Sequence, residues 1–188
     1  MAKPIVAVTM GDPAGVGPEV VLKALAHPQV RKACHPLILG DWQVLNRVRD
    51  GKRRYPELAP WKQGDAVSAD AHPVSVYSLS SLSPRQSGPG HPSKACGVAA
   101  YRYIRAAAEL VTAEAADAMA TAPISKRVLQ LAGYRYPGHT ELLAELTRAR
   151  EVRMMLLGKR LRVVLVTVHL PLVQVARELT RERIRVTV

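Results

Sequence analysis

The chain has 188 residues, 48% of them hydrophobic, which suffices for one buried core. Its formal net charge is +12 at neutral pH, yet the basic residues are scattered, with modest groups only at 47–54 and 177–185, and no zinc-finger spacing or RNA-binding aromatic motif accompanies them. This composition argues against a nucleic-acid-binding module, and it suits an enzyme for phosphorylated substrates.

Neither a membrane segment nor a disulfide framework is predicted. Glycine, aspartate and proline interrupt the first apolar run, and no later run approaches the roughly 20 apolar residues of a transmembrane helix. Cys34 and Cys96 lie far apart without a paired spacing, so we expect two buried thiols rather than a disulfide or a cysteine metal site. These features predict a cytoplasmic protein.

The N-terminal part of the chain predicts two pairs of a strand and a helix. A β-branched strand is expected over Pro4–Thr9, followed by a helix that opens at Pro18, where a missing N–H costs nothing. A second apolar strand is expected over Pro36–Gly40, with a helix from Asp41.

The middle of the chain is predicted to be irregular at first and regular afterwards. Residues 51–96 are rich in proline, glycine, serine and charge, and only one alternating strand, Val74–Leu79, is expected there. A helix over 97–114 follows, with apolar residues along one side. A short strand is expected next, over Ala118–Ala122.

The C-terminal part predicts two strands and one helix. The strands cover Arg153–Gly158 and Leu161–Val168, and a tight turn joins them. The second strand is apolar, so we expect it to be buried and to stop at His169. Residues 176–188 begin as an amphipathic helix without a stop signal, so residues 1–188 are expected to be the N-terminal portion of a longer protein. Strands that alternate with helices predict a layered α/β fold.

The loop after the first strand, Met10–Val20, is rich in glycine. The helix that follows offers free N–H groups and a positive dipole end, which suit an anion. The spacing matches neither the dinucleotide-binding fingerprint nor the P-loop, so an anion-binding loop and a plain strand-to-helix turn both remain open. Asp12 is either a polar contact to a ligand or a simple turn former.

The loop over Ala120–Val128 carries a second candidate. Ser125 is placed to cap the next helix. Lys126 then lies in the first helical turn, where the dipole disfavours a cation. A lysine in this place either contacts an anionic ligand or is a solvated surface residue.

Two histidines complete the set of candidates. His139 follows Gly138 and precedes Thr140, which is placed to cap a helix, so His139 and Thr140 suit a phosphate or a polarised hydroxyl. His169 is either a ligand or a hydrogen-bonded bystander. All these candidates lie at the C-terminal end of a predicted strand or at the start of a helix, which is the edge where open α/β sheets bind ligands.

Several motifs occur together in an order that resembles a known family. They are TMGDPAGVGPEV, MATAPISK, YPGHTELLAELT, RMMLLG and VTVHLPL. Together they resemble the N-terminal half of the 4-hydroxythreonine-4-phosphate dehydrogenase family of vitamin B6 biosynthesis. The resemblance covers essentially the whole chain, and residues 51–93 are the least alike.

This resemblance implies a three-layer α/β/α fold of the isocitrate and isopropylmalate dehydrogenase type, truncated because the C-terminal half of the two-subdomain enzyme is absent. It implies NAD- or NADP-dependent oxidation of 4-phosphooxy-L-threonine followed by decarboxylation, with a divalent metal ion such as zinc, magnesium or cobalt. It also implies a homodimer whose active site is shared between subunits.

The resemblance also assigns residues. His139 and Thr140 become substrate-binding residues and His169 a metal ligand, with Val168 where relatives often have threonine. Asp12 and Lys126 are neighbours of the site, and no catalytic base is predicted. One histidine cannot hold a metal ion that takes about three or four protein ligands, so we expect the 188-residue chain to be inactive alone.

Two kinds of alternative remain open. Similar proteins act on phosphorylated threonate or erythronate, or on cis-dihydrodiols of aromatic compounds, and the motifs do not distinguish these substrates. The alternative from another class is a basic binding module for nucleic acid or acidic partners. Such a module would need a contiguous basic face and binding that weakens steeply with salt.

Overall fold

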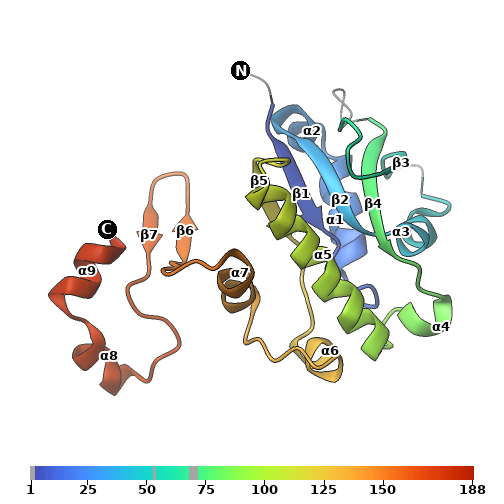
Figure 1. Cartoon of the computed structure of the whole chain (residues 1–188). Coiled ribbons are helices and arrows are strands. Elements are labelled where there is room, and N and C mark those ends of the chain that lie inside the picture. Colours follow the sequence, from blue (N-terminus) through green and yellow to red (C-terminus); the bar gives the residue numbers. More distant parts are fainter. Residues whose placement is uncertain (1–2, 53, 68–71) are drawn as a thin grey trace. The chain divides into compact units, whose positions relative to one another are not determined.

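A computed structural model of the chain describes residues 3–52, 54–67 and 72–188 (Figure 1). The chain divides into two compact units, Met1–Thr147 and Arg148–Val188, which are described separately below. Residues 53 and 68–71, which belong to the segment predicted to be irregular, lie outside the described residues. Within the described residues, no helix is long and apolar enough to cross a membrane.

A parallel sheet of five strands forms the centre of the first unit. Its strand order is β3-β4-β2-β1-β5, and all four strand pairs are parallel. A parallel sheet is covered on both faces, which explains why its central strands read as continuous apolar runs. The strands are β1 (Ile5–Thr9), β2 (His35–Asp41), β3 (Leu58–Trp61), β4 (Val74–Ser80) and β5 (Ala118–Thr121).

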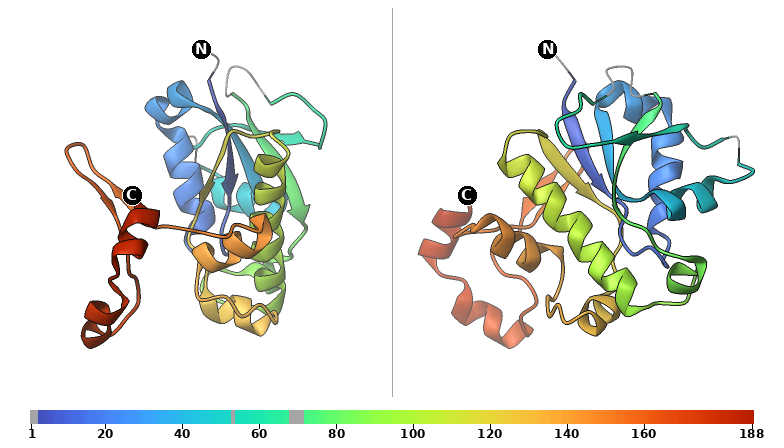
Figure 2. Two further views of the ribbon diagram at one scale, coloured as in Figure 1. Left: turned by 60° about the vertical axis from the view of Figure 1, so that its left-hand side comes forward. Right: turned by 45° about the vertical axis from the view of Figure 1, so that its right-hand side comes forward.

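Helices cover both faces of this sheet. Figure 2 shows α1 and α3 on one face and α5 on the other, where α6 and α7 pack against α5. This arrangement confirms the predicted three-layer α/β/α fold. The helices of the first unit are α1 (Gly17–Ala26), α2 (Pro28–Ala33), α3 (Trp42–Arg49), α4 (Pro84–Ser87), α5 (Lys94–Thr112), α6 (Lys126–Leu131) and α7 (His139–Thr147).

Helix α5 is the longest helix of the first unit, and its apolar side faces the sheet. Its N-terminus is capped by Ser93, whose hydroxyl accepts a hydrogen bond from the Cys96 N–H at 3.2 Å. A side chain at Gly97 would collide with the Val128 carbonyl, so this glycine lets α6 approach α5 closely. The packing of α5 therefore determines where α6 lies.

A buried carboxylate at the end of β2 is the centre of a hydrogen-bond network. Asp41 is fully buried, and its oxygens accept hydrogen bonds from the Val44 N–H at 3.0 Å, the Leu82 N–H at 2.7 Å and the Ser80 hydroxyl at 2.7 Å. The Ser80 hydroxyl lies 2.5 Å from the hydroxyl of the buried Tyr103. The network thereby connects β2, α3, the end of β4 and α5.

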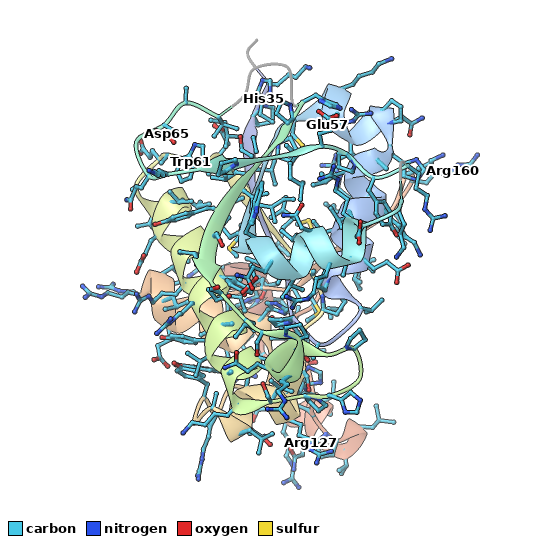
Figure 3. The ribbon with its side chains drawn as sticks, turned by 90° about the vertical axis from the view of Figure 1, so that its right-hand side faces the viewer. His35, Glu57, Trp61, Asp65, Arg127 and Arg160 are labelled. Atoms are coloured by element: carbon cyan, nitrogen blue, oxygen red, sulfur yellow. The ribbon has the colours of Figure 1, made fainter. Side chains whose placement is uncertain are left out.

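The segment over 51–96 is more regular than predicted. Besides the expected strand it contains β3 and α4, and α5 begins at its end. Strand β3 was missed because Pro60 argues against a strand, but β3 lies at the sheet edge, where proline is tolerated. Figure 3 shows Trp61 and Asp65 together at this edge, and the Trp61 indole N–H donates to the Asp65 carbonyl at 3.0 Å.

The second unit consists of a hairpin and two helices. Strands β6 (Met155–Leu157) and β7 (Arg162–Val164) pair antiparallel, as predicted, and α8 (Leu172–Glu178) and α9 (Arg181–Thr187) follow. None of the residues in these four elements is buried. The expectation of a buried strand that stops at His169 is wrong, because β7 ends five residues earlier and, within the described residues, its side chains are exposed or only half-buried.

The two cysteines are free thiols, as expected. Cys96 is buried, whereas Cys34 is only half-buried, so the expectation of two buried thiols is correct for one of them. Cys34 follows the last residue of α2, a short helix that has no buried residue.

Replacement of Asp41 by alanine should strongly destabilise the first unit, because two buried N–H groups and a hydroxyl would lose their acceptor. We expect a loss of about 3–5 kcal/mol in the free energy of unfolding, measured by urea denaturation with tryptophan fluorescence. The control is Asp65→Ala, since Asp65 is exposed and should cost about 1 kcal/mol or less. Equal losses in the two variants would contradict the role of the network.

Candidate functional site

The candidate site lies between β1 and β5, from which the chain continues to opposite faces of the sheet. Strands β1 and β5 are parallel neighbours, with Thr9 opposite Thr121 at their C-terminal ends. The loop after β1 leads to α1 on one face, whereas the loop after β5 leads to α6 on the other face (Figure 2). Such a switch point opens a crevice between two loops, and open α/β sheets bind ligands there.

The two loops at this switch point contact each other through their backbones. The Asp12 N–H donates to the Pro123 carbonyl at 3.0 Å, and the Ala122 N–H donates to the Thr9 carbonyl at 3.1 Å. Gly11 has a φ of +76°, and a side chain there would collide with the Pro123 carbonyl. The glycine therefore permits the close approach of the two loops.

Asp12 is 7% exposed and lies in the first of these loops. Its Oδ1 accepts a hydrogen bond from the Ala14 N–H at 2.9 Å. Burial raises the pKa of the Asp12 carboxyl, and the hydrogen bond from Ala14 offsets part of that effect. The turn-forming role is thus present in the structure, and the raised pKa also fits a carboxyl group at a ligand site.

Lys126 stands at the other side of the switch point as the first residue of α6. Ser125 caps this helix as predicted, with its hydroxyl accepting from the Val128 N–H at 3.3 Å. Lys126 is exposed, and it takes part in none of the ion pairs of the described residues. Among the described residues, its ammonium group therefore has no carboxylate partner.

His139 is the first residue of α7 and has an unpartnered nitrogen. Its Nε2 atom is buried without a hydrogen-bond partner in the described part of the chain. Burial lowers the pKa of its imidazole, so the ring is neutral at neutral pH. A buried polar atom without a partner is uncommon and suits a ligand contact. Thr140 is half-buried inside the first turn of α7, so the expectation that it caps this helix is wrong.

Aromatic contacts fix the loop that leads to His139. Tyr134 stacks on Tyr101 of α5, with ring centroids 3.9 Å apart. The Tyr136 hydroxyl donates to the Glu145 carboxylate at 2.8 Å, which raises the pKa of Tyr136 to about 12 and keeps the phenol protonated. These contacts tie the loop to α5 and α7. Among the described residues, no hydrogen bond joins His139 to the loops of Asp12 and Lys126.

His169 belongs to the second unit, in the segment between β7 and α8. It is exposed and has a φ of +55°, which is uncommon for a residue other than glycine. We expected the strand that precedes it to be part of the main sheet, but β7 pairs with β6 in a separate two-stranded sheet. In the described ranges, no group of three or more histidine, cysteine, aspartate or glutamate residues could hold a metal ion. The described residues therefore do not form a metal site, and the ligand role of His169 stays a prediction.

One residue of the switch point was not found from the sequence. Thr9 ends β1, is fully buried, and its hydroxyl has no hydrogen-bond partner within the described residues. A hydroxyl residue at the last position of an otherwise apolar strand is the signal that could have indicated it.

Comparison with known proteins places the chain in a family. The model of the family described as "Pyridoxal phosphate biosynthetic protein PdxA" matches residues 32–188. The chain belongs to this family. It is 46% identical, over 99% of its own length and 56% of the relative's, to a 4-hydroxythreonine-4-phosphate dehydrogenase of Trichlorobacter lovleyi.

The chain is also similar to a protein named for another substrate and to a solved structure. A D-threonate 4-phosphate dehydrogenase of Cupriavidus necator is 39% identical over 94% of this chain and 53% of its own length. The crystal structure of a 4-hydroxythreonine-4-phosphate dehydrogenase from Burkholderia phymatum matches with a TM-score of 0.83 and 38% identity, over 98% of this chain and 56% of that one. The chain thus spans about half the length of the PdxA relatives that it matches.

Replacement of Gly11 by alanine should disrupt the contact between the two loops. The added methyl group meets backbone that cannot move aside, so we expect a loss of roughly 3 kcal/mol or more in the free energy of unfolding. Gly51→Ala is the matched control, because Gly51 has a φ of +68° and open space around it. This control should lose only about 1–2 kcal/mol, the cost of the backbone conformation alone. Equal losses would mean that the loop contact contributes nothing.

Replacement of Asp12 by asparagine should change how stability depends on pH. Asparagine keeps an acceptor for the Ala14 N–H but cannot ionise. Because the pKa of Asp12 is raised in the folded state, the wild-type chain loses stability as pH rises from the ordinary pKa of aspartate through the raised value. The free energy of unfolding of the variant, relative to wild type, should therefore increase between about pH 4 and pH 7.

Glu19→Gln is the control for this measurement. The pKa of Glu19 is lowered, first by its hydrogen bond from Lys23, so ionisation of Glu19 stabilises the fold. The difference between this variant and wild type should change with pH in the opposite direction. A pH-independent difference for the Asp12 variant would show that its carboxyl is not perturbed.

Proposed function

We propose that this PdxA family member serves the oxidation of 4-phosphooxy-L-threonine at its secondary alcohol, with NAD or NADP as hydride acceptor and with decarboxylation to 3-amino-2-oxopropyl phosphate afterwards, and that the 188-residue chain by itself binds the substrate without converting it. The observation that carries this proposal is the unpartnered Nε2 of His139 within the YPGHT motif, in a chain 46% identical to a dehydrogenase of that name. The reaction would serve pyridoxal phosphate biosynthesis.

In this proposal His139 and Thr140 bind the substrate. The neutral imidazole has a free Nε2 that can accept a hydrogen bond from a substrate hydroxyl or donate one to a substrate oxygen, depending on its tautomer. The hydroxyl of Thr140, one residue further along α7, offers a second polar contact. Lys126 and Asp12 would be neighbours of the site at the switch point. The positive charge of Lys126 would attract the anionic substrate.

The chemistry also requires a hydride acceptor and stabilisation of the alkoxide. NAD or NADP supplies the first, and a divalent ion such as zinc, magnesium or cobalt is the group proposed for the second. His169 would supply one ligand to that ion. Since no group of three or more possible ligand residues comes together in the described residues, we derive no step of the reaction through the metal. By the same reasoning we propose that the 188-residue chain alone is inactive.

A homodimer with an active site shared between subunits is part of the proposal, as is a cytoplasmic location. Support for a partner surface comes from the second unit, where large apolar side chains are exposed, among them Leu157 at 71% and Leu172 at 87%. Exposed apolar surface of this kind is one of the features of protein–protein interfaces.

D-threonate 4-phosphate is the second candidate substrate, because a dehydrogenase for it is 39% identical to this chain. By their names, both substrates carry a phosphate at C4. They differ in the group beside the oxidised carbon. A panel of the two compounds distinguishes them.

Replacement of His139 by alanine should weaken substrate binding by about tenfold or more, since a buried polar contact is lost. Calorimetric titration of the 188-residue chain with 4-phosphooxy-L-threonine and with D-threonate 4-phosphate measures this effect. His27→Ala is the control, because His27 is exposed and lies at the start of α2.

The same chain, supplied with NAD or NADP and zinc, magnesium or cobalt, should show no reduction of the nucleotide. Turnover would overturn the proposed inactivity of the chain. Unchanged substrate affinity in His139→Ala would overturn the assignment of that residue.

A further inference from the structure

A cavity lies beside α3, away from the candidate site. Its volume is about 640 Å³, within the range of roughly 300–1,000 Å³ that small-molecule sites occupy. The loop that follows α3 ends at the N-terminal edge of the sheet, where the Glu57 carbonyl accepts a hydrogen bond from the Val74 N–H just before β3, whereas the switch point lies at the C-terminal ends of β1 and β5. The cavity is lined from this helix and loop, in part by Arg47, Arg49, Asp50, Lys52, Tyr55 and Glu57.

Three cations line this cavity without a carboxylate partner. Within the described residues, none of Arg47, Arg49 and Lys52 forms an ion pair. The guanidinium of Arg47 is held in place by hydrogen bonds to the Leu82 carbonyl at 3.1 Å and to the Ser87 hydroxyl at 2.7 Å. Arg49 donates one long hydrogen bond, to Asn46 Oδ1 at 3.4 Å, and the Lys52 ammonium contacts only the Tyr55 ring, so both charges lack an anionic partner among the described residues.

Tyr55 also lines this cavity and has a buried hydroxyl. This residue is 5% exposed, and its hydroxyl has no hydrogen-bond partner in the described part of the chain. The ammonium of Lys52 lies 5.6 Å from the centroid of its ring, and the guanidinium of Arg54 lies 5.3 Å from it. A buried hydroxyl without a partner is rare in native proteins and indicates a missing ligand or water.

Basic residues at the end of a helix also have a simpler role, since they complement the negative end of the helix dipole. That role fits Arg47 and Arg49, which lie in the last turn of α3. It does not account for Lys52 and Tyr55, which lie beyond the helix, nor for the cavity itself. The positive charges of Lys52 and Arg54 also act on Glu19 in α1. They lower its pKa slightly, although Lys23 is the main cause of that lowering.

Two carboxylates complete the lining. Asp50 follows α3, and Figure 3 shows Glu57 above α3, where the loop leads into β3. Neither forms an ion pair within the described residues. A ligand that meets cations and carboxylates in one cavity should carry both an anionic group and a cationic or hydroxyl group.

We propose that this cavity binds small phosphate compounds, with the phosphate held by Arg49 and Lys52 and with the Tyr55 hydroxyl as a further donor. An arginine fork and a lysine ammonium are the groups that proteins use for phosphate oxygens. Asp50 and Glu57 are then placed for an amino group on the same molecule. The site is separate from the candidate active site and does not depend on dehydrogenase activity.

The test is a titration of the 188-residue chain with inorganic phosphate, followed by amide chemical shifts and calorimetry at constant ionic strength. We expect saturable binding, with shifts centred on residues 46–57, and a loss of affinity of about tenfold or more in the double variant Arg49→Gln/Lys52→Gln. Tyr55→Phe should weaken binding severalfold, and its fold should be intact because the removed hydroxyl has no partner.

Lys62→Gln is the control for lost positive charge, because Lys62 is exposed and lies outside the cavity. Circular dichroism verifies that each variant is folded. Unchanged affinity in the double variant overturns the proposal. So do shifts confined to the loop after β1, or equal weakening by Lys62→Gln.

A second titration distinguishes free phosphate from a phosphate ester. O-phosphoethanolamine carries an amine beside its phosphate, so we expect it to bind more tightly than inorganic phosphate and to lose this advantage in Glu57→Gln. Equal affinities would assign the site to free phosphate instead. The absence of binding by both compounds overturns the proposal and leaves the proposed dehydrogenase function unaffected.

Discussion

The pairing of β1 with β5 is the constraint on which the candidate site depends. These strands come from distant parts of the sequence, and their parallel alignment brings the ends of both strands together. The loops beyond them then meet through the hydrogen bond from the Asp12 N–H to the Pro123 carbonyl. Without a side chain, Gly11 lets this contact form. The positions of Asp12 and Lys126 follow from this contact rather than from any interaction between their own side chains.

Much of the first unit could be predicted from the sequence, because its elements follow local patterns. Strand β2 reads as an uninterrupted apolar run since both of its faces are covered. Helix α6 begins where Ser125 indicates. The sequence did not predict β3, because a proline is tolerated only in an edge strand. Which strand lies at the edge depends on the order of the whole sheet and not on the local sequence.

The chemistry of the site was less predictable than its place. The sequence indicated His139, but its unpartnered Nε2 and lowered pKa arise from packing around α7, which no local pattern contains. Thr9 escaped notice because its burial depends on neighbouring strands. His169 was expected at the end of a buried strand because the apolar run Leu161–Val168 resembles a core strand. Burial of a strand requires a second layer that packs on it, and within the described second unit the two-stranded hairpin has no such layer.

The separation of β1 and β5 along the chain also bears on the order of folding. The Ile5 N–H donates to the Asp117 carboxylate at 2.7 Å, across 112 positions of sequence. During synthesis β1, β2 and β4 can pair well before β5 has left the ribosome, because they need only the earlier residues. Closing so long a loop has an entropic cost, which grows only slowly with loop length but must be met before the contact forms. The candidate site between β1 and β5 can therefore form only after residues 118–123 have been added to a sheet whose other strands can already pair.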